Sequence, residues 1–290
     1  MLCAGFTIVK NAVRYAYPVR ESILSALPLC DVFYVLLGDS EDDTEALIRS
    51  IDSPKLRIHY SKWDKEAIRN GEVLAIETNK ALALIPDTYT WCLYVQADEV
   101  FHEKDYTNIQ EAMHRYRQDD AVEGLLFSYY HFWGSFSYIG TTSNWYRREI
   151  RIIKNRKDIF SYRDAQGFRK KPNEKLQVVL IDAHVYHYGW VRPPAKMQEK
   201  YAGVQQYWSN ENKYIPDQSE FDYTAIDDLA PFVGTHPTVA RSMVDAQSWE
   251  FQYDPSKTKM AFKEKFKRWL FHLTSYRFFE YKNYRILHRL

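Results

Sequence analysis

Apolar runs and helix-spaced apolar positions alternate along the first hundred residues of the chain. Short apolar runs without alternation are typical of strands buried on both faces, and four occur here: residues 6–11, 31–39, 55–61 and 91–96. Between them the spacing predicts three helices: residues 15–27, a segment that begins at Ser40, and residues 71–85. This alternation predicts an α/β fold with a parallel sheet covered by helices on both faces.

The second half of the chain predicts a mixed continuation of the sheet. A helix is expected over residues 105–118. Three later apolar segments are interpreted as strands: residues 124–135, 148–155 and 178–190. A further helix begins at a proline pair near residue 193. We therefore expect one domain over residues 1–255 and a separate extension over residues 256–290.

Polar side chains follow several of the predicted strands. The segment WCLYVQADEVFH begins as an apolar run and reaches Asp98 and Glu99, while Asn11 and Asp39 hold the same place after the first and second strands. Open α/β sheets bind ligands beyond the carboxyl ends of their strands, so these positions predict a ligand site. Taken singly, each acid could equally be a solvated strand end.

Composition narrows the class of protein without naming an activity. The 290 residues are 46% hydrophobic and 27% charged, which is ordinary for a globular protein, and no apolar run approaches the roughly 18 residues that cross a bilayer. The first residues lack a basic leader, so we expect a cytoplasmic protein, soluble or peripheral at the inner face of the membrane. Its three cysteines lack metal-like spacing and are expected to be reduced packing thiols.

The C-terminal extension differs in charge from the rest of the chain. From Lys257 to Leu290, ten Lys or Arg stand against two acids, a balance of +8, so the other residues carry −7 of the total +1. Apolar positions spaced as one helix face, with basic residues around them, predict a basic helical tail: Phe262, Phe266, Trp269, Leu270 and Leu273. That face either enters an anionic membrane surface or packs on the preceding domain. No nucleic-acid-binding module is recognisable.

Four motifs, in order, resemble those of family-2 type glycosyltransferases with the GT-A (Rossmann-like) fold. They are TIVKN, GDSEDDT, ETNKAL and QADE, and the resemblance covers roughly residues 6–190. It implies a mixed, mainly parallel sheet and transfer of a hexose-type sugar from a nucleoside-diphosphate donor. A glycan or lipid-linked acceptor in cell-surface polysaccharide synthesis is implied as well, with inversion at the anomeric carbon.

The resemblance also assigns the donor site residue by residue. Donor contacts are implied for five residues that match the family motifs: Asn11, Asp39, Asn79, Gln96 and Asp98. Trp145 is a further candidate, as a wall on which the sugar stacks, although it could equally fill an aromatic core. Asp98 stands at the last acid of the family's metal-binding signature, so Mn²⁺ or Mg²⁺ would bind there and bridge the two phosphates. Gln96 replaces the first acid of that signature, which departs from the family pattern.

Two further roles follow from the resemblance. The segment DAHVYHYGW offers His184 and His187, which we expect on one strand face with Tyr186 opposite, and His187 is the expected second metal ligand. An inverting transfer needs a carboxylate that takes the acceptor proton. Asp164, after the IRIIKN strand, is the expected base, and Glu149 is the second candidate.

Two other functions compete with glycosyl transfer. A sugar-nucleotidyltransferase would need a glycine-rich phosphate loop after the first strand, and VKNAVRYAYP contains no glycine. A catalytically silent GT-A-fold protein that binds carbohydrate or acts as a scaffold is compatible with Gln96.

Overall fold

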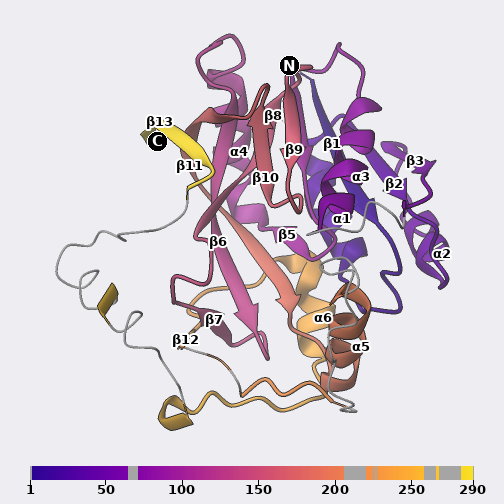
Figure 1. Cartoon of the computed structure of the whole chain (residues 1–290), viewed down its shortest axis with the longest axis vertical. Helices are drawn as coiled ribbons and strands as arrows, with labels where there is room; N and C mark the ends of the chain where they lie inside the picture. Colours follow the sequence, from indigo (N-terminus) through magenta and orange to yellow (C-terminus); the bar gives the residue numbers. More distant parts are fainter. Residues whose placement is uncertain are drawn as a thin grey trace.

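The computed structural model describes residues 2–64, 71–205, 220–224, 226, 228–257, 266–267 and 282–289. Its core is one twisted sheet in the order β3-β2-β1-β4-β8-β6-β11-β10-β9 (Figure 1). The strands of this path are β1 (Cys3–Val9), β2 (Val32–Leu37), β3 (Leu56–Tyr60), β4 (Trp91–Tyr94), β6 (Gly124–Trp133), β8 (Arg148–Lys154), β9 (Ile159–Tyr162), β10 (Gly167–Lys170) and β11 (Glu174–Trp190). The remaining strands are β5 (Glu99–Phe101), β7 (Tyr138–Gly140), β12 (Leu229–Pro231) and β13 (Tyr284–Arg289).

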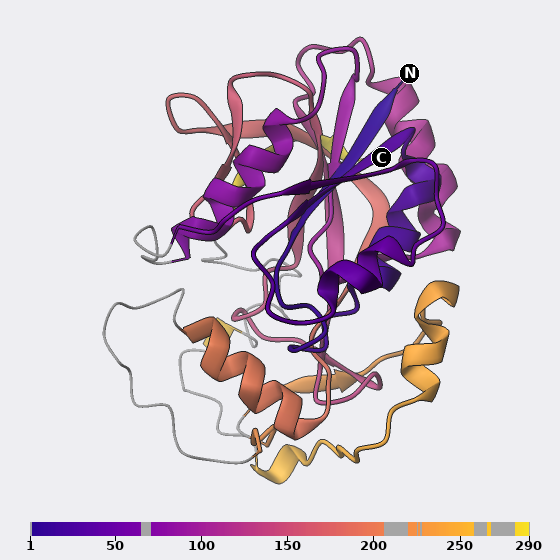
Figure 2. The same cartoon turned by 90° about the vertical axis from the view of Figure 1, so that its right-hand side faces the viewer.

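Helices cover both faces of the sheet (Figure 2). One apolar core joins it to α1 (Val19–Ala26), α2 (Thr44–Arg49) and α4 (Tyr106–Arg115), and a second core joins the other face to α3 (Glu72–Ala83). Strand β1 contributes Val9 to the first core and Phe6 to the second, which is why its sequence is apolar without alternation. The three cysteines are free and buried, as predicted.

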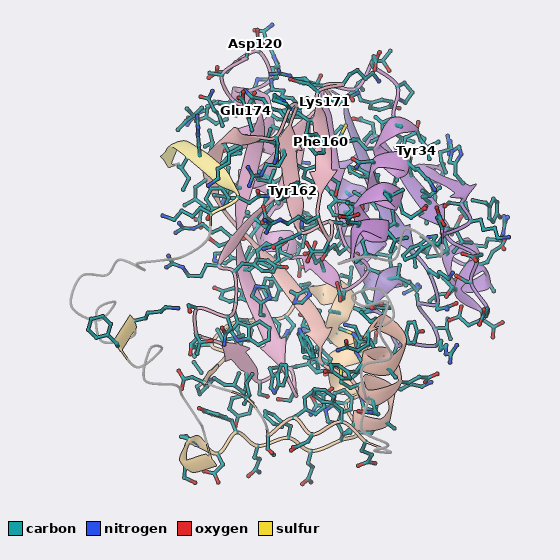
Figure 3. The ribbon with its side chains drawn as sticks, viewed as in Figure 1. Tyr34, Asp120, Phe160, Tyr162, Lys171 and Glu174 are labelled. Atoms are coloured by element: carbon teal, nitrogen blue, oxygen red, sulfur yellow. The ribbon has the colours of Figure 1, made fainter. Side chains whose placement is uncertain are left out.

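Strand directions confirm the predicted mixed α/β sheet. β3, β2, β1 and β4 run parallel, β8 inserts antiparallel between β4 and β6, and β6 and β11 are again parallel. The β9–β10 hairpin was not predicted, because each strand has only four residues. Figure 3 shows Phe160 and Tyr162 on β9. The helix after β11 is α5 (Pro194–Gln205), and a short α6 (Arg241–Asp245) lies further along the chain.

The predicted helical extension lies mostly outside the described residues. Of its expected apolar face only Phe266 is described, so the interfacial helix and its membrane contact stay predictions. The last described segment corrects the expectation of an all-helical tail, because Tyr284–Arg289 forms β13, which pairs parallel with β11. Among the described helices, none has both the length and the apolar character that a membrane span requires.

Candidate functional site

The carboxyl ends of β1 and β4 border a cavity of about 160 Å³. Its lining combines charged, amide and aromatic side chains, among them Lys10, Tyr17, Trp63, Gln96 and Asp98. The tip of the β9–β10 hairpin closes another side, since Ala165 lines the cavity and its carbonyl accepts a hydrogen bond from the Gln96 amide at 3.1 Å. The structure therefore forms a largely apolar crevice with a few polar groups where parallel strands end, as predicted.

Asp39 is not among the residues that line this cavity, but it pairs with Lys10, which lines it. Its carboxylate accepts hydrogen bonds from Lys10 Nζ at 2.7 Å and from the Trp63 backbone N–H at 3.2 Å. Burial alone would raise the pKa of Asp39, but these two donors outweigh it and hold the pKa below its usual value. Asp39 is thus an anion attached to a cation that itself lines the cavity.

Asn11 and Asn79 are held by backbone groups rather than presented to a ligand. The Asn11 side chain accepts a hydrogen bond from the Glu41 N–H at 2.8 Å, which ties the loop after β1 to the loop after β2. Asn79 on α3 exchanges two hydrogen bonds with the backbone of Ser161 on β9, at 2.7 and 3.1 Å. Both amides hold neighbouring elements together, and their predicted donor contacts stay predictions.

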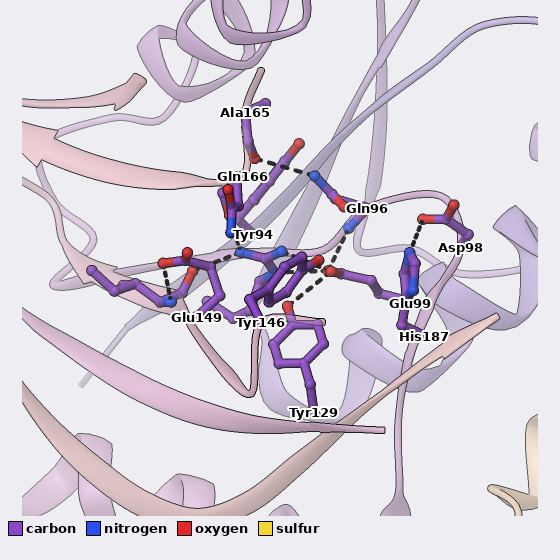
Figure 4. A network of polar contacts seen from close by, with 12 residues as sticks. Tyr94, Gln96, Asp98, Glu99, Tyr129, Tyr146, Glu149, Ala165, Gln166 and His187 are labelled. Carbon is purple, nitrogen blue, oxygen red and sulfur yellow. Dashed lines mark hydrogen bonds and ion pairs between the residues drawn. The ribbon is translucent and has the colours of Figure 1, made fainter. Parts of the chain in front are cut away.

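Glu99 lies in a fully buried ion pair. Its two oxygens accept hydrogen bonds from Arg151 Nε and Nη2, each at 2.7 Å, and both side chains are completely buried (Figure 4). The Tyr129 hydroxyl donates to the same carboxylate at 2.8 Å, and the Gln96 backbone N–H donates at 3.1 Å. This acid holds the loop after β4 in place and offers no oxygen to the crevice.

Asp98, the neighbouring residue, faces basic side chains at longer range. Oδ1 lies 3.7 Å from His187 Nε2, and Oδ2 lies 3.6 Å from Lys200 Nζ on α5. Burial raises the pKa of Asp98, but His187, Lys200 and Arg192 lower it more, so the net pKa is depressed. Asp98 is therefore an anion at neutral pH.

Lys200 is an ammonium enclosed by aromatic rings and a carbonyl. Its Nζ donates to Gly189 O at 2.7 Å and lies 4.9 Å from the Tyr17 ring centre and 5.6 Å from that of Trp190. Burial, with the nearby Arg192, lowers the pKa of Lys200 to about 7. An anionic ligand beside it would favour the protonated form. Sequence reasoning missed Lys200 because nothing local marks it.

A pair of histidines continues from Asp98. His187 Nδ1 lies 3.1 Å from His131 Nδ1, and His131 Nε2 lies 2.6 Å from the Tyr146 carbonyl. A carbonyl only accepts, so His131 Nε2 carries hydrogen and, when both rings are neutral, His187 donates through Nδ1 and turns Nε2 toward Asp98. Burial lowers the pKa of both histidines, which favours this neutral state.

The predicted placement of His184 was wrong. His184 stacks on Tyr130, with ring centres 4.7 Å apart, whereas His187 contacts His131. The two histidines are three residues apart, and strand residues separated by an odd number point to opposite faces. Tyr186 shares the His184 face, since it also contacts Tyr130. Of the two histidines, only His187 lies beside Asp98, which lines the cavity.

The described residues do not form the predicted Mn²⁺ or Mg²⁺ centre. Asp98 and His187 are brought together as predicted, but no group of three His, Cys, Asp or Glu residues in the described part of the chain could hold a metal ion. Gln96 directs its amide nitrogen to Ala165 O. The Lys200 side chain already lies beside Asp98, so a dication there would have to displace it or favour its neutral form.

The two candidate bases differ in exposure. Asp164 is half-buried in the turn between β9 and β10, next to Ala165 at the crevice. Glu149 on β8 is only 1% exposed and accepts a hydrogen bond from the Ile150 N–H at 2.9 Å. Burial raises the pKa of Glu149 to about 7. Only Asp164 belongs to a turn that reaches the cavity.

Trp145, predicted as a sugar-stacking wall, packs within an aromatic cluster. Its ring lies 5.3 Å from that of His131 and 5.8 Å from that of Trp133. The side chain is half-buried and is not among the residues that line the cavity. Its predicted donor contact therefore stays a prediction.

Comparison with known proteins gives partial overlaps only. No protein-family model and no curated protein matches the chain. Glucosyl-3-phosphoglycerate synthase from Mycobacterium tuberculosis, solved with Mn²⁺ and UDP, overlaps 46% of this chain at 16% identity and a TM-score of 0.30, and the overlap spans 45% of that synthase.

Two other solved structures overlap to a similar degree. The overlap with S. aureus TarS (residues 1–349) covers 74% of this chain and 67% of TarS, at 11% identity and a TM-score of 0.38. The overlap with the 4-diphosphocytidyl-2C-methyl-D-erythritol synthase from Anaerococcus prevotii covers 53% of this chain and 70% of that synthase, at 9% identity and a TM-score of 0.33. Overlaps this weak assign no activity to the chain.

Proposed function

We propose that this protein is a glycosyltransferase that moves a sugar from a nucleoside-diphosphate donor to a glycan or lipid-linked acceptor. The observation that carries the proposal is the crevice itself. It lies beyond the carboxyl ends of β1 and β4, and Lys10, Trp63 and Asp98 line one cavity. Such a cavity offers an aromatic wall to a base and the Lys10 ammonium to a diphosphate.

Asp39 is the proposed contact for the ribose or base. Its carboxylate is 36% exposed and accepts hydrogen bonds only from Lys10 and the Trp63 N–H among the contacts described. Two carboxylate oxygens can accept about four hydrogen bonds, so capacity remains for ribose hydroxyls or a base N–H. A ligand there would keep the Lys10 ammonium close to the phosphates.

Asp164 is the proposed general base of an inverting reaction. The acceptor oxygen would form a bond to the anomeric carbon while the bond to the donor diphosphate breaks; the hydroxyl proton passes to Asp164 and the electron pair leaves with the diphosphate. The turn that carries Asp164 is unusual, since its neighbours Arg163 and Ala165 adopt positive φ angles of 56° and 60°. Backbone strain of this kind clusters at functional sites.

The resemblance extends the proposal to synthesis of cell-surface polysaccharide at the cytoplasmic face of the membrane. It does not include a Mn²⁺ or Mg²⁺ cofactor, because Asp98 and His187 are the only pair among the described residues that could ligate one there, and no third ligand joins them.

A thermal-shift panel of UDP, GDP, CDP and ADP, each with EDTA and with MnCl₂, tests the donor class. A ligand at about 100 times its dissociation constant stabilises by roughly 2.7 kcal/mol, which raises the melting temperature by about 5 °C or more in a protein of this size. We expect at least one diphosphate to produce this shift. If none does under either condition, the protein does not bind such donors and the proposal fails.

A further inference from the structure

The Lys200 ammonium occupies a site built for a cation. Asp98 Oδ2 lies 3.6 Å from Nζ, Gly189 O lies 2.7 Å away, and the rings of Tyr17 and Trp190 flank it. The side chain is only 13% exposed, so this position is fixed by packing. A carboxylate, a carbonyl and two ring faces are all attractive to positive charge.

Gly189 makes this close arrangement possible. A Cβ at residue 189 would lie 2.6 Å from His187 Nε2 and 2.9 Å from Asp98 Oδ2, closer than side-chain atoms pack. Without a side chain at this residue, the His187 ring and the Asp98 carboxylate pack directly on the backbone whose carbonyl accepts the hydrogen bond from Lys200. The strand end is therefore shaped around these three side chains.

A second buried cation, Arg192, lies close to Lys200, since both side chains donate to the Gly189 carbonyl. Arg192 is 2% exposed, and its guanidinium donates to the carbonyls of Tyr15 and Gly189. It lies over the Tyr17 ring with the cation 4.9 Å from the ring centre, the same ring that Lys200 contacts. Both basic groups thus lie near Asp98 and contact the Tyr17 ring, and these two residues line the cavity. Two cations beside one carboxylate favour a polyanionic ligand there.

We propose that the Lys200 ammonium, backed by Arg192, supplies the positive charge that holds the donor diphosphate, so that donor binding needs no divalent metal ion. The inference rests on the proposed function, because it concerns the same crevice. As the bond between the anomeric carbon and the diphosphate oxygen breaks, negative charge grows on the leaving group, and a preorganised ammonium stabilises it.

Calorimetric titration of the full chain with UDP, GDP, CDP and ADP tests this inference. For whichever diphosphate binds, we expect affinities in EDTA and in MnCl₂ to agree within about twofold. Lys200→Met should weaken binding about 10- to 100-fold, the range for a lost charge-assisted hydrogen bond, while Lys200→Arg should retain most of it. Lys196→Met is the matched control, since Lys196 lies one turn away on α5 in a surface pair with Glu199.

The outcomes separate the inference from the proposed function. Binding that requires Mn²⁺ and disappears in His187→Ala overturns the inference, assigns the metal to His187 and Asp98, and leaves the donor class intact. Unchanged affinity in Lys200→Met also overturns it. No binding under any condition overturns both proposals. If Lys200→Met does not fold, the wild-type comparison with and without metal and the Lys200→Arg variant still decide the question.

Discussion

Asp98 and Glu99 are adjacent acids with opposite environments. Glu99 has two bonds from Arg151 and two further donors, and both members of the pair are completely buried. Asp98 has His187 and Lys200 at 3.7 and 3.6 Å, beyond ordinary hydrogen-bond length, and it borders the cavity.

The two environments show how one strand end can be rigid and still be able to bind a ligand. A carboxylate whose lone pairs are all used holds the backbone of the loop, as Glu99 does. A carboxylate with loosely placed partners retains capacity for a ligand, as Asp98 does. We infer that the Glu99–Arg151 pair positions Asp98.

Breaking the buried pair should have the largest effect. Arg151→Met leaves Glu99 charged and buried without its partner, so we expect the free energy of unfolding to fall by about 3–5 kcal/mol in denaturant titrations. The double variant Glu99→Leu/Arg151→Met removes both charges and should recover most of the loss. A single variant as stable as the wild type would refute the structural role of the pair.

Glu149 is a third buried acid near Arg151, and its proton affinity differs from that of Asp98. Its pKa is raised by burial to about 7 from 4.5, so the folded protein binds the proton more tightly than the unfolded chain. The stability that this proton contributes is complete below pH 4.5 and is lost as the pH rises to 7. Glu149→Gln should remove this decline and be more stable than wild type at pH 8, by up to about 3 kcal/mol.

Melting temperatures from pH 4 to 8 measure this difference. Parallel curves for the wild type and Glu149→Gln would show that Glu149 has an ordinary pKa. If Glu149→Gln also abolishes transfer while Asp164→Asn does not, Glu149 rather than Asp164 is the base.

Asp98→Asn should separate function from stability. We expect transfer to fall about 100-fold or more, because the Asp98 charge favours protonated Lys200 and its loss leaves the buried Lys200 amine neutral. Unfolding should change by only about 1 kcal/mol. Steady-state kinetics and denaturant titration of the same preparation provide both numbers. Near-normal transfer by a folded Asp98→Asn protein would remove Asp98 from the site.

The smallest effect is expected at Asp39. Asp39→Ala should weaken donor binding by about tenfold and leave kcat nearly unchanged, because its contacts are similar in the ground and transition states. Measured KM and kcat distinguish this from a catalytic role. An unchanged KM would restrict Asp39 to its hydrogen bonds with Lys10 and the Trp63 backbone.

The fold followed from the sequence because its signals are local. Apolar runs such as the one containing Phe6 and Val9 reflect burial on two faces, and helical spacing marked α3. Strand ends then located Asp98 at the cavity and Asp39 beside Lys10, which lines it. The β9–β10 hairpin left no such signal, and the tail strand β13 forms only by pairing with distant β11.

The site was less predictable because its contacts span long stretches of chain. Arg151 lies 52 residues from Glu99, and His131 lies 56 residues from His187, so no spacing rule connects them. Lys200 resembles any other helix lysine until α5 packs beside Asp98. The hydrogen bonds of Asn79 were not predictable for the same reason, since its partner Ser161 is 82 residues away.

Turnover of nucleoside-diphosphate sugars tests directly whether the protein is a glycosyltransferase that uses Asp98 and needs no divalent metal ion. The purified protein is incubated in EDTA with a panel of such donors, and release of the nucleoside diphosphate is followed by NMR, beside Asp98→Asn and Lys196→Met proteins. We predict release from at least one donor by the wild type and by Lys196→Met, and almost none by Asp98→Asn. Equal release by Asp98→Asn, or no release by the wild type with or without Mn²⁺, would contradict the account.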